Sequence, residues 1–260
     1  MNSGSDRGRN LEVASQLMEA ACRQGARLLV LPENFSFFGG SEEEKRAARE
    51  DAKTGPSLTF LQTFAARWRV WIVGGSIPVA DPSSNKVLNV CFVVDESGCV
   101  RGRYDKIHLF DVDVGDGTRY RESDFVQPGT HPVVVETPFG RLGLAICYDL
   151  RFPELFRVLS SLHAELIALP AAFTVITGRD HWEILLKARA IENFSYLLAA
   201  GQWGQHAGGR QTYGHSMVVE PWGMAVAQCA DGVGFALAPL ERERITLCRQ
   251  RIPCLSHRRM

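Results

Sequence analysis

The segment Leu144–Glu154, LAICYDLRFPE, ends an apolar run at Cys147 and continues at once with polar and charged residues. The apolar run has the composition of a buried strand, and Pro153 is typical of the first turn of a helix. A tight turn between them lies near free backbone N–H groups, which stabilise a thiolate. We therefore expect Cys147 to be a nucleophile at the end of a strand, although a lone cysteine in apolar sequence is more often part of the core.

Helices and strands alternate on both sides of this segment, and two pairs of neighbouring strands have hairpin turns between them. This order predicts an α/β fold with mixed sheets, in one domain over residues 1–260. The two halves have a similar order of elements, which favours two stacked sheets with helices outside. Helices are predicted at 11–22, 57–68, 153–162 and 181–193, strands at 26–33, 70–76, 141–148, 164–173 and 196–201, and hairpins at 87–104 and 215–228.

The overall composition is that of an ordinary globular protein, with 45% hydrophobic and 22% charged residues. The 29 basic and 29 acidic side chains balance, so nothing favours nucleic acid or an anionic membrane as a partner. No apolar run approaches the roughly 20 residues of a membrane span, and no leader pattern opens the chain. The seven cysteines form no CxxC pair and leave one over, which favours a reducing compartment. The sequence therefore predicts a cytoplasmic protein.

Charged residues also follow two other predicted strands. Glu33 comes after the apolar run LLVLP, and Lys106 follows a segment that resembles a strand. Each alone is more often a solvated strand end. In a cleft, however, the carboxylate serves as a general base and the ammonium stabilises a developing oxyanion. Together with Cys147 they supply a base, an electrophile and a nucleophile.

Metal and cofactor motifs are weak or absent. Residues 111–122, DVDVGDGTRYRE, place acidic side chains at three positions of an EF-hand loop, but Gly115 and Asp116 break the pattern at the fifth and sixth positions. Zinc spacing and glycine-rich nucleotide loops do not occur. We expect neither a metal nor a cofactor. The basic segment 242–259 is interpreted as a surface or subunit contact.

The segments LPENF, YDKIHLFD and CYDLRFPELFR together resemble the carbon–nitrogen hydrolase (nitrilase) superfamily, whose signature is Glu, Lys and Cys in this chain order. The resemblance extends over residues 10–259 and includes TGRDHWEILLKARAIEN and YGHSMVVEPWG. It implies a four-layer α-β-β-α sandwich. It also implies a homodimer or higher homo-oligomer, formed through the helices that follow the cysteine strand.

Within the superfamily the chain is similar to the Nit branch, which contains deaminated glutathione amidases and omega-amidases. The resemblance implies that Glu33 is the base, Cys147 the nucleophile, and Lys106 with the Tyr148 N–H the oxyanion site, while Glu122 positions lysine and substrate. The implied reaction converts the primary amide of deaminated glutathione and water, through a thioester, into a carboxylate and ammonia. Omega-amidase action on 2-oxoglutaramate or succinamate is the alternative, and a catalytically silent binding module of the same fold is disfavoured.

Further residues have expected supporting roles. Arg151 and Glu154 are expected to pair near the turn that presents the nucleophile. His181 and Trp182, near the start of a predicted helix, are candidates for substrate contact, with core packing of Trp182 as the alternative. Family members usually begin with a strand that ends in methionine, and Met1 matches that last residue. We therefore expect the first strand to be missing from this sequence.

Overall fold

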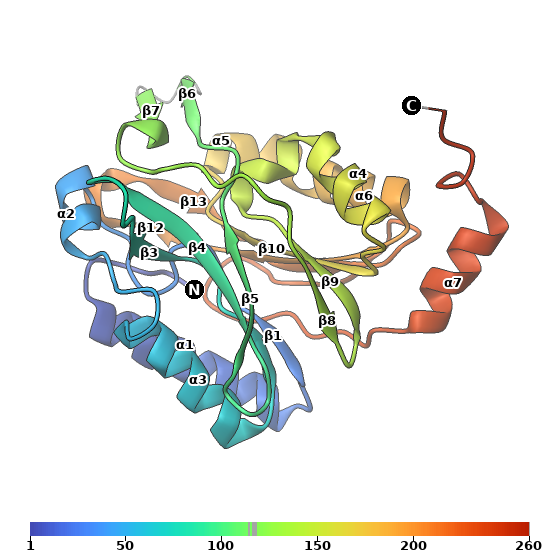
Figure 1. Cartoon of the computed structure of the whole chain (residues 1–260), viewed down its shortest axis with the longest axis horizontal. Coiled ribbons are helices and arrows are strands. Elements are labelled where there is room, and N and C mark those ends of the chain that lie inside the picture. The colour runs from blue at the N-terminus through green and yellow to red at the C-terminus, as the bar shows by residue number, and fades with distance from the viewer. Residues whose placement is uncertain (114, 116–118, 260) are drawn as a thin grey trace.

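Two mixed β-sheets lie face to face in the computed structural model, which describes residues 1–113, 115 and 119–259. Figure 1 shows helices on the outer side of each sheet, so the layers follow the order helix, sheet, sheet, helix. A sheet covered by helices on one face and by a second sheet on the other buries both faces, which explains why its central strands are apolar throughout. The predicted four-layer α-β-β-α sandwich is confirmed.

Five strands form the first sheet, namely β1 (Leu28–Val30), β2 (Trp71–Val73), β3 (Ile77–Ala80), β4 (Val87–Val94) and β5 (Val100–Asp105). Their order is β1-β2-β4-β3, and β5 also pairs with β4. The outer face is covered by α1 (Arg7–Arg23) and α3 (Pro56–Trp68) (Figure 1). The Asp6 side chain caps α1 by accepting a hydrogen bond from the Arg9 N–H at 3.0 Å.

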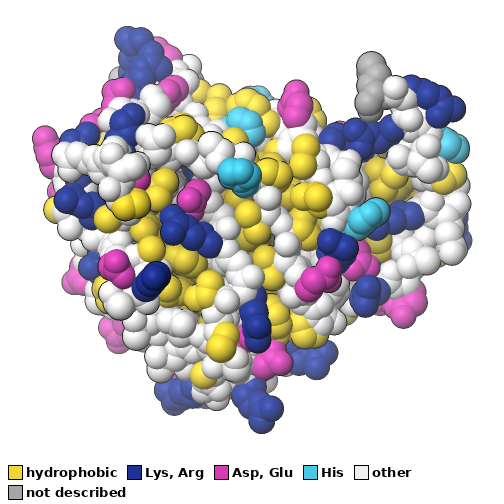
Figure 2. Space-filling model, in the orientation of Figure 1, with side chains coloured by type: hydrophobic (Ala, Val, Ile, Leu, Met, Phe, Trp, Pro, Cys, Tyr) yellow, Lys and Arg dark blue, Asp and Glu magenta, His cyan; other side chains and the backbone are white. Residues whose placement is uncertain are grey.

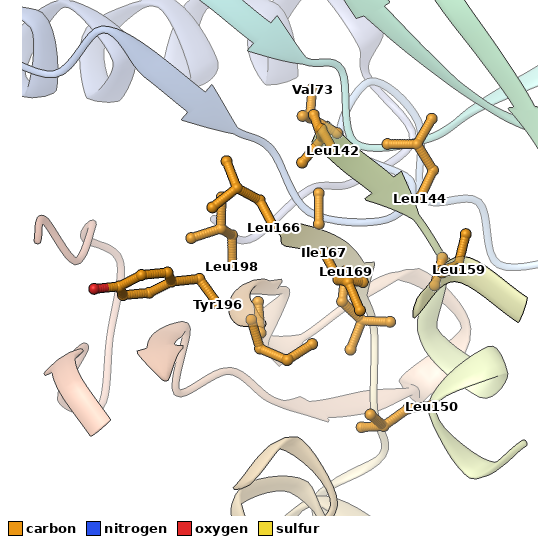
Figure 3. Packing of buried hydrophobic residues seen from close by; sticks show 14 of the residues in the cluster. Val73, Leu142, Leu144, Leu150, Leu159, Leu166, Ile167, Leu169, Tyr196 and Leu198 are labelled. Carbon is orange, nitrogen blue, oxygen red and sulfur yellow. The ribbon is translucent and has the colours of Figure 1, made fainter. Parts of the chain in front are cut away.

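Six strands form the second sheet, namely β8 (Val134–Thr137), β9 (Gly140–Leu144), β10 (Leu166–Ala171), β11 (Tyr196–Gly201), β14 (Met217–Val219) and β15 (Ala225–Gln228). Their order is β15-β14-β11-β10-β9-β8, in which β9, β10 and β11 run parallel. Helices α4 (Pro153–Ser161) and α6 (Glu183–Asn193) cover its outer face. Figure 3 shows Val73 of the first sheet beside Leu142 of the second, in the core between the sheets.

Shorter elements join the two sheets and surround one end of them. Figure 1 shows β6 and β7 as a hairpin above the sheets and α7 standing away from them near the C-terminus. The helices and helical turns are α2 (Glu42–Ala47), η1 (Glu122–Asp124), η2 (Cys147–Arg151), α5 (Val175–Thr177), η3 (Gly178–Trp182), η4 (Ala207–Gly209) and α7 (Arg242–Arg251); the strands are β6 (Asp111–Asp113), β7 (Arg119–Arg121), β12 (Trp203–Gln205) and β13 (Gln211–Tyr213).

The structure corrects several sequence predictions. The strand expected at 141–148 ends at Leu144, and Cys147–Arg151 form a 3-10 turn instead. The helix expected at 181–193 begins as a π-turn over Gly178–Trp182. The acidic segment 111–122, expected to be a loop, contributes both strands of a hairpin, and its Asp116 lies outside the described residues. The expectation of a missing first strand stays a prediction.

Charged side chains of both signs are spread over the face shown in Figure 2, in keeping with the balanced composition. Within residues 1–113, 115 and 119–259, every helix is too short or too polar to cross a membrane.

Candidate active site

The three predicted site residues lie together at one end of the sandwich. Glu33 follows β1, Lys106 follows β5, and Cys147 begins η2. Their exposed fractions are 3%, 2% and 5%, so each is removed from bulk water. The Lys106 Nζ lies 2.9 Å from the Glu33 Oε1. The structure thus brings a carboxylate, an ammonium and a thiol from three separate parts of the chain into one buried cluster.

Lys106 lies between two carboxylates. Its Nζ donates to both oxygens of Glu122, at 3.1 and 2.9 Å, as well as to Glu33. Glu122 also accepts a hydrogen bond from the Phe110 N–H at 2.7 Å. Burial lowers the pKa of Lys106, but Glu122 and Glu33 outweigh burial and raise it above its ordinary value. Lys106 therefore keeps its positive charge at neutral pH.

Asn89 on β4 connects the two carboxylates. Its amide nitrogen donates to the Glu33 Oε1 at 3.0 Å and to the Glu122 Oε1 at 3.4 Å. Asn89 is itself buried, with an exposed fraction of 7%. Because the amide and the ammonium contact the same carboxylate oxygens, they fix the position of both glutamates. The sequence gives no signal for Asn89, since one asparagine within an apolar strand has no motif around it.

The base and the nucleophile have opposite pKa shifts. Burial alone would raise the pKa of Glu33, but Lys106 and then Arg210 lower it below its ordinary value. Burial raises the pKa of the Cys147 thiol, and the charge of Glu33 raises it further, although Lys106 acts in the opposite direction. In the resting site Glu33 is therefore an anion and Cys147 a neutral thiol. The shifts keep the proton on sulfur at rest, and the Glu33 carboxylate is the base available to take it when the thiol attacks.

Asp149 anchors the turn that presents Cys147. It is fully buried, and its Oδ2 accepts hydrogen bonds from the Tyr104 hydroxyl at 2.7 Å and the Ile146 N–H at 2.8 Å. Its Oδ1 accepts a bond from the His108 N–H at 3.1 Å and lies 2.7 Å from the His108 Nδ1. Asp149 therefore ties η2 to the end of β5. Its place two residues after the nucleophile was the signal that could have predicted this role.

The predicted pairing of Arg151 with Glu154 is corrected by the structure. Arg151 ends η2, and its Nη2 donates to the His181 Nδ1 at 3.2 Å, while its guanidinium lies 5.5 Å from the centroid of the Phe173 ring. Glu154 follows Pro153 in the first turn of α4 and is exposed to solvent. Among the residues described, Arg151 contacts His181 and Phe173, and no ion pair joins it to Glu154. An acidic side chain in this first turn stabilises the helix N-terminus.

His181 and Trp182 do not line the pocket within the described part of the chain. Trp182 is fully buried, donates from Nε1 to the His215 carbonyl at 2.9 Å and packs against Phe173. Core packing, the alternative left open for Trp182, is therefore what the structure shows. His181 is exposed and contacts Arg151. The hydrogen bonds of both side chains are to other parts of the protein.

A pocket of about 580 Å³ opens over the buried cluster. The ring of Tyr148 packs against that of Phe110, which lines the pocket, and that of Phe152, at 5.1 and 5.2 Å between centroids. The described part of the chain contains no group of three or more His, Cys, Asp or Glu side chains placed to hold a metal ion. The pocket lining includes Glu33, Asn89, Lys106, Glu122 and Cys147, together with Phe38, Gly40, Lys45, Phe110, Tyr120, Phe125, Gly208 and Arg210.

Comparisons with known proteins agree with this geometry. A family model described as carbon-nitrogen hydrolase matches residues 1–250. A deaminated glutathione amidase of Synechocystis sp. (strain PCC 6803 / GT-S) is 43% identical, over 99% of this chain and 95% of the relative. The structure is similar to that of Saccharomyces cerevisiae Nit3, a member of branch 10 of the nitrilase superfamily, with a TM-score of 0.90 and 32% identity over 100% of this chain and 93% of that chain.

A third similarity concerns the cysteine. An amidase from Nesterenkonia sp. AN1, seen with acrylamide added at its active-site cysteine, has a TM-score of 0.80 and 27% identity, over 98% of this chain and 95% of that chain. The family model spans nearly the whole sequence, and the relatives align with almost all of this chain. Both findings point to the same family. This chain belongs to the carbon–nitrogen hydrolase family.

Proposed function

We propose that this chain is an amidase that hydrolyses deaminated glutathione through a thioester on Cys147. The observation that carries the proposal is the buried cluster in which Lys106 contacts Glu33 at 2.9 Å beside the thiol. Relatives that bear the name deaminated glutathione amidase, at about 43% identity over nearly the whole chain, support this substrate.

The first half of the reaction forms the thioester. The Cys147 sulfur attacks the amide carbonyl while Glu33 takes the thiol proton. Negative charge develops on the carbonyl oxygen, where the Lys106 ammonium and the Tyr148 N–H donate hydrogen bonds. Glu122 holds Lys106 in place through both carboxylate oxygens. The protonated Glu33 then gives its proton to the leaving nitrogen, and the C–N bond breaks.

The second half reuses the same carboxylate. With the amine gone, Glu33 is again an anion and takes a proton from an entering water as the water oxygen attacks the thioester carbonyl. The tetrahedral intermediate collapses by breaking the C–S bond. Glu33 then returns its proton to the Cys147 sulfur, which restores the resting site. The net reaction consumes one water and yields an acid and an amine.

The substrate's own chemistry corrects the expected leaving group. Both amides of deaminated glutathione are substituted on nitrogen, so it has no primary amide and does not release ammonia. The amide between its 2-oxoglutarate part and its cysteine corresponds to the ω-amide of 2-oxoglutaramate. Cleavage there gives 2-oxoglutarate and cysteinylglycine. Ammonia is the product only for a primary amide such as 2-oxoglutaramate or succinamate.

The size of the pocket favours the larger substrate. Sites that take drug-sized ligands have volumes of about 300–1,000 Å³, and the pocket over Cys147 measures about 580 Å³. Such a volume has room for the dipeptide part of deaminated glutathione beside the acyl part. A short ω-amide would leave much of the pocket to water. Omega-amidase activity is therefore the second candidate, with the same acyl part and the same residues.

Parallel assays of wild-type protein test the proposal. Cysteinylglycine release from deaminated glutathione and ammonia release from 2-oxoglutaramate are measured with a Cys147→Ala control. We expect the larger kcat/KM for deaminated glutathione and loss of both activities in the variant. A preference for 2-oxoglutaramate moves the chain to omega-amidase, and wild-type silence on both overturns the proposal. Cys99→Ala, which removes an exposed thiol, is the matched cysteine control.

The proposal extends to the domain organisation, the compartment and the oligomeric state of the enzyme. We propose that residues 1–260 act as one catalytic domain in the cytoplasm, as a homodimer or higher homo-oligomer. The seven cysteines are all free thiols, which suits a reducing compartment. Large apolar side chains are exposed on α4 and α6, and these support assembly through that face.

A further inference from the structure

Two cations that the proposed mechanism does not use line the same pocket. Lys45 belongs to α2, and Arg210 lies between η4 and β13. Within the described ranges neither side chain forms an ion pair with an Asp or Glu, whereas Lys106 contacts two glutamates. Two positive charges without carboxylate partners make this side of the pocket attractive to an anionic group.

Arg210 is held in a fixed orientation. Its guanidinium lies over the rings of Phe38, Phe110 and Tyr120, at 5.5, 5.8 and 5.2 Å from their centroids. One terminal nitrogen donates to the Ala172 carbonyl at 2.9 Å. The Nε is buried and has no hydrogen-bond partner among the residues described. A guanidinium that is fixed in this way and still has a free donor suits a carboxylate, which binds Arg through two parallel hydrogen bonds.

Lys45 adds a second positive charge near the same region. Its side chain is half-buried, and its Nζ lies 4.8 Å from the centroid of the Phe125 ring. Burial and the charge of Arg210 lower the pKa of Lys45 to about 8, although Glu122 and Glu33 act in the opposite direction. Lys45 is therefore close enough to Arg210 for the two charges to repel. An anion bound between them relieves that repulsion.

Ala172 links the guanidinium to the nucleophile. Its carbonyl accepts a hydrogen bond from Arg210, and its N–H donates to the Cys147 Sγ at 3.5 Å. One residue thus separates the two groups, a span of less than about 10 Å. In both candidate substrates a short carbon chain joins the scissile carbonyl to the carboxylate of the acyl part. The glycine carboxylate of deaminated glutathione lies farther from that carbonyl, beyond the scissile bond. The acyl carboxylate therefore fits the Arg210 position better.

We propose that Arg210 and Lys45 bind the carboxylate of the substrate's acyl part, with Arg210 as the bidentate partner and Lys45 as the second cation. This inference rests on the proposed function for the identity of the acyl group. The two cations would determine which amides the enzyme selects. Amides that end in a carboxylate are accepted, and neutral amides of the same length are poor substrates. Both residues act in substrate recognition and take no part in proton transfer.

A matched pair of affinity labels tests the proposal without requiring turnover. In 5-chloro-4-oxopentanoate, a ketone stands in place of the scissile carbonyl and a carboxylate ends the chain; its methyl ester is the neutral partner. The Cys147 sulfur displaces chloride to form a thioether, and Glu33 takes the thiol proton. The measured quantity is the ratio of kinact/KI for acid over ester, in wild type, Arg210→Met, Arg210→Lys and Lys45→Met. Arg9→Met and Lys53→Met, at exposed positions, are the matched controls.

The wild type and both control variants are expected to prefer the acid. Arg210→Met is expected to lose about 10- to 100-fold of that preference, the range of one or two charged hydrogen bonds. Lys45→Met loses less, and Arg210→Lys keeps part of the preference because it keeps the charge. Labelling by the ester shows that a variant retains a folded, reactive site, so a misfolded variant is recognised.

The outcomes separate this inference from the proposed function. Equal labelling by acid and ester in the wild type, or an unchanged ratio in Arg210→Met, overturns the carboxylate site even if deaminated glutathione is hydrolysed. A wild-type acid preference that disappears in Arg210→Met upholds the site even if neither candidate substrate is hydrolysed. In the latter case the proposed substrates are wrong and another carboxylate-bearing amide is the substrate.

Discussion

Cys147 has a backbone conformation that residues with side chains rarely adopt, with φ at 48°. Such a conformation costs about 1–2 kcal/mol for a residue other than glycine. Strain of this kind persists only where the surroundings impose it. Here Asp149 imposes it, because its two carboxylate oxygens receive hydrogen bonds from both sides of the turn. The polar residues after the cysteine therefore build the turn that presents the thiol.

Replacing Asp149 tests this account of the turn. Asp149→Asn turns one carboxylate oxygen into a donor that faces other donors, including the Ile146 N–H and the Tyr104 hydroxyl. We expect the free energy of unfolding to fall by about 2–4 kcal/mol, as for other disrupted buried networks, together with most of the amidase activity. Urea unfolding measures the change. Asp124→Asn, at an exposed position, is the control, and equal stability of the two variants would contradict the assigned role.

Lys45 gives the reaction a predicted alkaline limit. Burial and the charges of Arg210 and Lys106 lower its pKa to about 8, against Glu122 and Glu33, which raise it. The ammonium is therefore intact below pH 8 and loses its proton as pH rises through 8. Because kcat/KM reports groups of the free enzyme, its value for 2-oxoglutaramate is expected to decline through this range.

The control for this pH profile is Lys45→Met. The variant is expected to have a lower kcat/KM at pH 7 and no decline centred near pH 8, since the titrating group is gone. The Lys53→Met variant, changed at an exposed lysine, should keep the wild-type profile. A wild-type profile that rises through pH 8, or a decline that survives in Lys45→Met, would show that Lys45 does not bind the carboxylate.

At the scale of elements, two short loops meet at the rim of the pocket and carry the proposed carboxylate site. Gly40 precedes α2, which bears Lys45, and Gly208 lies just before Arg210. A Cβ on Gly208 would approach the Gly40 carbonyl oxygen to 2.8 Å, and Gly208 has φ at 71°. The backbones therefore touch at this point, and only glycine permits the approach.

A matched pair of glycine variants tests the importance of this contact. Gly208→Ala introduces both an unfavourable φ and a clash with Gly40, whereas Gly209→Ala introduces an unfavourable φ with no atom within 4 Å. We expect Gly208→Ala to raise KM about 10-fold or more, since a small displacement of binding groups is costly. Gly209→Ala should have a smaller effect. Equal KM values in steady-state assays of the two variants would contradict a role for the contact.

The long elements could be predicted from the sequence, and several short ones could not. Apolar periodicity over 11–22 and 57–68 matches α1 and α3, because each helix buries one continuous apolar face. Helix α2, EEEKRA, has no buried residue and so no periodic signal, yet it carries Lys45. Helix α7 could not be predicted for the same reason, because its two buried residues, Ile245 and Cys248, make too short an apolar pattern.

Some residues of the candidate site could likewise be predicted from the sequence, and others could not. Glu33, Lys106 and Cys147 could be predicted because each lies at the end of a segment that resembles a strand and matches a family motif. Asn89 and Arg210 could not, because their importance depends on which other atoms the fold brings near them. Glu33 and Asn89 are 56 positions apart in the chain and only 3.0 Å apart in space.

At the scale of the whole molecule, the exposed face of α4 and α6 is the expected surface of assembly. Ile184 and Ile191 on α6 have exposed fractions of 68% and 48%, and Val158 on α4 and Leu162 just after it have 43% and 41%. The two helices contact each other, so these exposed side chains lie on neighbouring helices. A face of this kind is usually covered by a partner.

Ile184→Glu tests whether that face joins two copies. A charge at the centre of an apolar contact is costly to bury, so the variant is expected to be monomeric where the wild type is at least dimeric. Light scattering coupled to size-exclusion chromatography measures the mass. Val100→Glu, at a similarly apolar and exposed position at the start of β5, is the control. A monomeric wild type, or an unchanged mass for Ile184→Glu, would contradict the prediction.

Intact-mass spectrometry of the protein, quenched in acid during turnover of deaminated glutathione, detects the proposed thioester itself. We predict a 2-oxoglutaryl adduct on Cys147 in wild type, formed at the same rate as cysteinylglycine is released in the first turnover. The adduct and the activity should both be absent in Cys147→Ala. Cysteinylglycine release by Cys147→Ala, or an adduct on another residue, would contradict a thioester mechanism at this site.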